Sequence, residues 1–201
     1  MKKLLAIAAL LSAPALAHAN LVVNGSFEDY SVGPKSWSTF YNNSNVAGWT
    51  VGDLGIEIRN NVAGKAADGV RFAELDTTGN SWISQIIHTN ANQALELSFS
   101  YAPRVAVPKD SNGIEVYWND KLLGKAEADG SNGSIWFDLS YAVSADAQGS
   151  GVLKFAAIGN SDRLGGSLDN ISVTTVPEPG SASMLLAGPG ILAAVVRRRR
   201  A

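Results

Sequence analysis

The chain has no cysteine and almost no histidine. Without cysteine there is no disulfide bond, thiol nucleophile or thiolate metal site, so the fold must depend on its hydrophobic core or on a metal ion with oxygen ligands. Of the two histidines, His18 falls in the N-terminal segment discussed next, which leaves only His88. A single histidine excludes a multi-histidine zinc site. Its place at the end of a predicted strand favours a solvated side chain over a catalytic base.

Long apolar runs are absent except at the two ends of the chain. At the N-terminus, Lys2 and Lys3 precede an apolar run from Leu4 to Leu16, and Ala17-His18-Ala19 follows as an A-x-A cleavage site. This order is typical of a secretory signal peptide. We therefore predict that signal peptidase removes residues 1–19 and that the mature chain begins at Asn20.

The C-terminal tail, residues 176–201, combines a short motif, an apolar segment and a basic cluster. Pro177-Glu178-Pro179 precedes apolar residues 182–196, and Arg197–Arg200 follow. As a helix the apolar segment would span about 22 Å, whereas the hydrocarbon core of a bilayer is about 30 Å thick. The basic cluster should stay on the cytoplasmic side. The tail therefore predicts a short hydrophobic sorting helix with transient membrane association.

These residues resemble the PEP-CTERM sorting signal of Gram-negative bacteria, in which Pro177, Glu178 and Pro179 form the motif. The resemblance implies recognition by an exosortase, an integral-membrane transpeptidase. It also implies export through the inner membrane to the cell surface or extracellular matrix. The alternative is a simple anchor helix that follows a Pro-Glu-Pro linker.

Basic residues are scarce between the two ends. Without the predicted signal peptide and tail, the domain contains ten basic and seventeen acidic residues and carries a net charge near −7. Nucleic acids and anionic lipids bind through Lys and Arg contacts to phosphate, so an acidic domain argues against both partners. Hard cations such as calcium are compatible with it. Residues 20–175 are long enough for one domain with a substantial core.

A sustained helical period is absent from residues 20–175, where apolar residues alternate with a period of two instead. Clusters of Gly, Asn, Asp and Ser separate these stretches, as turns require. The pattern predicts an all-β fold, an antiparallel β-sandwich. In the hairpin from Glu115 to Leu123, Asn119-Asp120 should adopt positive φ at the turn. The predicted strands are Leu21–Val23, Gly48–Val51, Gly55–Arg59, Val70–Leu75, Trp82–Ile87, Leu95–Tyr101, Ile114–Trp118, Lys121–Ala126, Ile135–Tyr141, Val152–Ile158 and Ser167–Thr175.

The domain opens with Asn20-Leu21-Val22-Val23-Asn24-Gly25-Ser26-Phe27-Glu28, followed by Gly48-Trp49-Thr50-Val51, and closes with Gly165-Gly166-Ser167-Leu168-Asp169-Asn170-Ile171-Ser172-Val173. This combination resembles the galactose-binding-like jelly roll, the fold of many carbohydrate-binding modules. The resemblance implies that the first and last segments lie side by side. In many such domains a structural calcium ion lies between them, and Glu28 and Asp169 match its acidic ligands. Alternatively, Glu28 binds backbone amides in its turn and Asp169 caps a strand end.

Glu57, Glu74 and Asp76 form a second acidic set. Phe72, Glu74 and Asp76 share one face of their strand, because side chains two residues apart point the same way. Such carboxylates are compatible with the acid and base of a glycosidase, with hydrogen bonds to sugar hydroxyls, or with solvated positions.

All five tryptophans lie in the mature domain, and flat aromatic faces can stack on sugar rings. Trp49, Trp82 and Trp136 are predicted to be core residues. Trp37 and Tyr41 fall in a predicted loop over residues 31–45, rich in Ser and Asn, and are candidate ligand-binding residues. Arg104 could belong to the same rim.

The sequence as a whole predicts an exported, non-enzymatic surface or matrix protein that recognises polysaccharide. The candidate ligand-binding residues are Trp37, Tyr41, Glu57, Glu74 and Asp76. The alternatives are a structural matrix or adhesion protein without sugar binding, and a secreted glycoside hydrolase.

Overall fold

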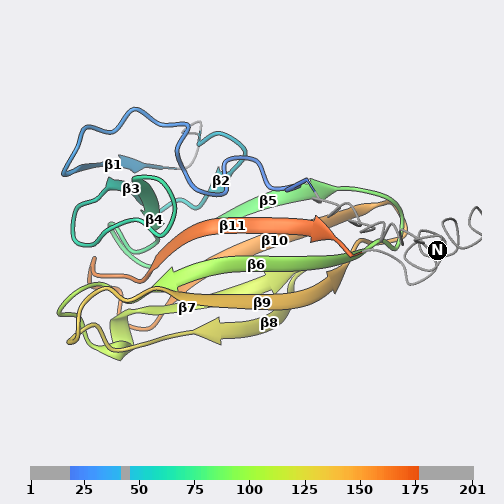
Figure 1. Cartoon of the computed structure of the whole chain (residues 1–201). Helices are drawn as coiled ribbons and strands as arrows, with labels where there is room; N and C mark the ends of the chain where they lie inside the picture. The colour runs from blue at the N-terminus through green and yellow to red at the C-terminus, as the bar shows by residue number, and fades with distance from the viewer. Residues whose placement is uncertain (1–18, 42–45, 177–201) are drawn as a thin grey trace, which may run out of the picture.

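The computed structural model describes residues 19–41 and 46–176 (Figure 1). The predicted sorting tail, apart from Val176, and the predicted signal peptide, apart from Ala19, lie outside these residues. Within the described residues, no helix has the length and apolar character needed to cross a membrane.

Two antiparallel sheets form a sandwich, as the alternation of apolar residues predicts. The strand order is β1-β3-β4-β11-β6-β9 in the six-stranded sheet and β2-β5-β10-β7-β8 in the five-stranded sheet. Apart from the β7–β8 hairpin, whose strands are neighbours in one sheet, the eight strands from β4 to β11 alternate between the sheets in the order of a jelly roll. The strands are β1 Ser36–Phe40, β2 Thr50–Val51, β3 Ile56–Asn60, β4 Arg71–Glu74, β5 Trp82–His88, β6 Ala94–Ala102, β7 Gly113–Trp118, β8 Lys121–Ala126, β9 Phe137–Ser144, β10 Ser150–Ile158 and β11 Ser167–Thr175, with a 3-10 helix at Lys109–Ser111.

All predicted strands except the first are present, with boundaries shifted by a few residues. Leu21–Val23 is not a strand, because side chains accept from two of its three backbone amides: Asn20 from Val22, and the Oε1 atom of Gln85 from Val23 at 2.8 Å. The Oδ1 atom of Asn20 accepts hydrogen bonds from the amides of Val22 (2.9 Å) and Val173 (3.0 Å). Such local bonds compete with a regular ladder and favour turns.

The predicted loop over residues 31–45 contains strand β1 instead. Ser36–Phe40 pairs with β3 over its whole length. Trp37, Thr39 and Phe40 are residue types common in strands, but the serines and asparagines around them indicate a loop, and the pairing with β3 makes the segment a strand. The predicted hairpin between β7 and β8 is confirmed, with φ of 49° at Asn119 and 60° at Asp120.

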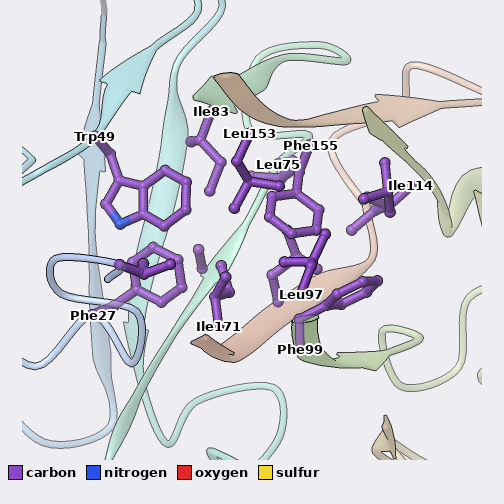
Figure 2. Close-up of a cluster of buried hydrophobic side chains, with 14 of the residues drawn as sticks. Phe27, Trp49, Leu75, Ile83, Leu97, Phe99, Ile114, Leu153, Phe155 and Ile171 are labelled. Atoms are coloured by element: carbon purple, nitrogen blue, oxygen red, sulfur yellow. The ribbon is translucent and has the colours of Figure 1, made fainter. Parts of the chain in front are cut away.

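The hydrophobic core fills the space between the sheets (Figure 2). Phe27 stacks on Trp49 with ring centroids 5.9 Å apart, and Phe99 meets Phe155 edge to face at 4.9 Å. Trp49 is therefore a core residue, as predicted. The first and last segments of the domain also lie together, since the amide of Leu21 donates to the carbonyl of Val173 at 2.8 Å.

Trp82 and Trp136 lie outside the core, contrary to the prediction. Both are half-buried. The Nζ atom of Lys154 lies 5.1 Å from the ring centroid of Trp82. Trp136 donates from Nε1 to the carbonyl of Lys65 and packs edge to face on Phe72. A period of two shows which residues share a face of a strand, but it does not identify which of the two faces packs on the core.

Candidate functional site: an arginine-lined pocket

Strands β1, β3 and β4 lie side by side at one end of the sandwich (Figure 1). In their register Trp37 is opposite Arg59, and Glu57 is opposite Glu74. Side chains two residues apart on a strand point to the same face, so these four residues share one face of the sheet. Ile56 and Ile58 alternate with them and belong to the hydrophobic core.

Arg59 holds the two glutamates together. Its Nη2 atom lies 2.6 Å from Oε2 of Glu57 and 2.9 Å from Oε2 of Glu74, and its Nε atom donates to Glu57 at 2.9 Å. Like charges directly opposite on paired strands repel each other. The guanidinium between them offsets that repulsion, and the Thr77 hydroxyl and the Gly165 amide donate to the remaining carboxylate oxygens of Glu57 and Glu74, at 2.9 Å and 2.6 Å.

Glu74 is the deeper of the two carboxyl groups, with no exposed surface. Burial raises its pKa from 4.5 to about 8, against the opposing effect of Arg59, and the nearby charge of Glu57 raises it further. One cation serves two carboxylates here, and the deeper carboxyl loses most hydration on ionising, which raises the pKa of Glu74.

This buried carboxyl predicts that the protein becomes less stable as the pH rises from about 4.5 to about 8. The folded-state pKa of Glu74 lies above the unfolded value, so the folded state binds more protons in this interval and loses stability through it. Asp169 acts in the same direction, because burial raises its pKa from 3.8 to about 7. Urea titrations at several pH values should show a slope of up to about 1.4 kcal/mol per pH unit for each group. The Glu74→Gln variant should show a shallower decline. Equal stability at pH 5 and pH 8 would contradict the assignment.

A small pocket of about 120 Å³ opens over this face. Trp37, with 54% of its surface exposed, forms one side. Arg104 and Arg163 join Arg59 and Glu57 in lining it. The remaining lining residues are Val62 and Ala63.

The two further arginines come from the loops after β6 and before β11. The Nη1 atom of Arg104 donates to the carbonyl of Arg163 at 3.1 Å and lies 3.7 Å from Oε2 of Glu74. Asp76 fixes the second loop, because its Oδ2 atom accepts from the amides of Asp162 and Arg163, both at 3.0 Å. The pocket is therefore built by segments that are distant in sequence.

The structure brings together only some of the predicted ligand-binding residues. Trp37 and Glu57 line the pocket, and Glu74 lies beneath it. Asp76 acts one layer further back, on the loop of Arg163. Tyr41 is outside the lining, with its ring against Gly55. Solvated positions are wrong for Glu74 and Asp76, which are both fully buried.

Arg59 and Arg163 were not among the sequence candidates, and Arg104 was only placed on a possible rim. The alternation of Glu57 and Arg59 on one strand face is the signal that could have indicated an ion pair. The position of Arg163 has no comparable signal, because it depends on how the loop before β11 folds back over β3 and β4.

Glu28 and Asp169, the predicted calcium ligands, both contact the segment before β4. Glu28 accepts from the amides of Val70 (2.7 Å) and Arg71 (2.6 Å) and forms an ion pair of 2.6 Å with Arg71. Asp169, at a β-bulge in β11, accepts from the amides of Ala67 (2.7 Å) and Asp68 (2.9 Å).

These carboxylates, as they stand, fit amide and guanidinium donors, whereas calcium needs six to eight converging oxygens. The described part of the chain contains no group of three or more acidic, histidine or cysteine side chains suited to a metal ion. Calcium binding stays a prediction.

Comparisons with known proteins agree with the interpretation of the C-terminal tail. Residues 175–200 match the PEP-CTERM protein-sorting motif, which indicates an exported protein. The chain is 32% identical over 158 residues to a multifunctional-autoprocessing repeats-in-toxin protein of Vibrio cholerae serotype O1. That match covers 78% of this chain, and the chain spans only 3% of the toxin's length.

Solved structures with a similar fold include carbohydrate-binding modules. A family 35 module from Clostridium thermocellum has a TM-score of 0.46 and 13% identity, over 70% of this chain and 99% of the module. A family 61 module in complex with β-1,4-galactotriose has a TM-score of 0.48 and 16% identity, over 79% of this chain and 99% of the module.

Proposed function

We propose that this protein recognises polysaccharide at the cell surface or in the extracellular matrix and does not catalyse a reaction. The main support is the exposed ring of Trp37 beside a pocket lined with hydrogen-bonding side chains. Sugar sites commonly combine an apolar wall with a few convergent polar groups. The PEP-CTERM match supports export, with an exosortase as the processing partner.

Binding rather than hydrolysis is supported by the state of the two glutamates. A glycosidase needs two carboxyl groups that reach the scissile bond. Here Glu74 has no exposed surface, and Arg59 bonds to both carboxylates. An acid that cannot touch substrate cannot donate a proton to it.

Replacing Trp37 by alanine in the tail-less domain, residues 20–175, should weaken sugar binding about tenfold or more. A central aromatic anchor carries a large share of binding energy, and tenfold corresponds to about 1.4 kcal/mol. The half-exposed ring contributes little to the core, so the melting temperature should change little. A glycan array followed by calorimetry on the best ligand measures both.

Phe137→Ala provides the matched control, because Phe137 is also exposed but lies on β9, at the opposite edge of the same sheet. It should leave binding unchanged. Failure of the unsubstituted domain to bind any glycan, with self-association instead, would favour a structural matrix protein. Release of product from chromogenic glycosides would favour a hydrolase.

Calcium is proposed as a structural ion, and thermal unfolding of the same domain tests whether it binds. Melting temperatures are compared in calcium buffer and in excess chelator. An ion held by Glu28 and Asp169 would raise the melting temperature in calcium by mass action. An identical melting temperature in both buffers would contradict the proposed ion.

A further inference from the structure

The pocket carries the opposite charge from the domain around it. Three of its lining residues are arginines and one is a glutamate. The domain outside the predicted signal peptide and tail has seventeen acidic and ten basic residues. Three of the ten basic side chains thus line one small pocket, where their positive charges would attract an anionic group.

Two of the three arginines keep donors for a ligand. Arg59 is already engaged by Glu57 and Glu74. Arg163 forms no ion pair with any described residue, and its side chain is exposed. Arg104 donates to a backbone carbonyl, and its contact with Glu74 is long, at 3.7 Å. A guanidinium has five N–H donors, so both retain unused capacity.

The cations also crowd one another. Burial lowers the pKa of Arg104, and the nearby charge of Arg59 lowers it further. A negative group between these guanidinium groups would reduce their mutual repulsion and accept their free donors. Arginine forks match planar or tetrahedral oxyanions in a bidentate manner.

We propose that this pocket binds the anionic group of an acidic sugar, a carboxylate or a sulfate ester, while the sugar ring stacks on Trp37. The proposal rests on the proposed polysaccharide recognition and specifies its ligand class. A hollow of about 120 Å³ holds one charged group with part of a ring. The net negative charge of the domain repels extended polyanions. The ligand is therefore a single acidic sugar unit, either within an otherwise weakly charged polysaccharide or at its end.

Calorimetry with methyl glucuronide, glucose 6-sulfate and methyl glucoside tests the ligand class. The first or second should bind, and the neutral glycoside should bind at least tenfold more weakly. Arg163→Gln and Arg104→Gln should each reduce acidic-sugar affinity by about tenfold to a hundredfold. Arg163→Lys should retain part of the affinity, since it keeps the charge but not the fork.

Lys121→Gln is the matched control. Lys121 pairs with Trp118, at the last residue of β7. The loop of Arg104 instead contacts Asn112, which precedes the first residue of β7, so Lys121 lies at the other end of that strand. It should leave affinity unchanged. Arg163 is exposed, so its variants should remain folded, which circular dichroism checks.

The possible failures are distinguishable. Equal binding of neutral and acidic sugars that is unaffected by Arg163→Gln overturns the inference and leaves polysaccharide recognition standing. Binding of inorganic sulfate as tight as that of the sugars would reveal a plain anion site and also overturn it. Absence of binding to any glycan, neutral or acidic, overturns both proposals.

Discussion

The Arg59→Leu variant should lose about 3–5 kcal/mol of unfolding free energy, the largest effect expected from a single substitution at this site. Removing one partner of a buried ionic cluster leaves its charges uncompensated. Glu57 and Glu74 are opposite each other in the register of β3 and β4, and Arg59 is the cation that bonds to both. Urea denaturation followed by circular dichroism measures the loss at neutral pH.

Removing the carboxylates at the same time should recover most of this loss. In the triple variant Arg59→Leu, Glu57→Gln, Glu74→Gln no buried charge remains at the pair, and amide side chains of similar shape replace the acids. Arg163→Leu serves as the control, since an exposed substitution normally changes stability by less than about 0.5 kcal/mol. A loss below about 1 kcal/mol for Arg59→Leu, or a triple variant no more stable than the single one, would refute this account of the cluster.

The Phe27→Ala variant should lose a similar amount, about 3–5 kcal/mol, for an unrelated reason. Removal of a buried phenylalanine forfeits its transfer free energy and leaves a cavity. Phe27 has no exposed surface and stacks on Trp49 (Figure 2). It also belongs to the N-terminal segment, which lies next to β11, so the same cavity loosens the junction between the two ends of the domain.

Thermal and urea unfolding of Phe27→Ala are best compared with those of Val23→Ala. Val23 belongs to the same segment, but 55% of its surface is exposed. Its truncation should cost less than about 0.5 kcal/mol. If both variants were equally stable, Phe27 would not be part of a tightly packed core, and the position of the N-terminal segment would need revision.

The strands were predictable because each carries its own signal. A period of two with turn residues between the stretches located every strand from β2 to β11, and Asn119-Asp120 identified the turn between β7 and β8. Strand β1 was missed because the Ser and Asn residues around it indicated a loop. Ser36–Phe40 becomes a strand through pairing with β3, and no residue within the segment announces that partner.

The candidate site was predictable only in part, for a related reason. Exposure of Trp37 followed from its polar surroundings, and the shared face of Glu74 and Asp76 followed from their spacing. Arg59 can contact both Glu57 and Glu74 only because β3 and β4 pair in a particular register, which the sequence does not specify. Arg163 is 104 positions beyond Arg59 along the chain, so only the completed jelly roll brings both to one pocket.

Strand β11 lies between the pocket and the point where the chain leaves the sandwich, after Thr175. It begins at Ser167, opposite Glu74, and runs to Thr175 at the other end of the sandwich (Figure 1). Nine residues of extended chain span about 30 Å. A molecule tethered through the residues after Thr175 would hold its arginines at the far tip, pointing away from the surface that retains it and toward polymer arriving from the surroundings.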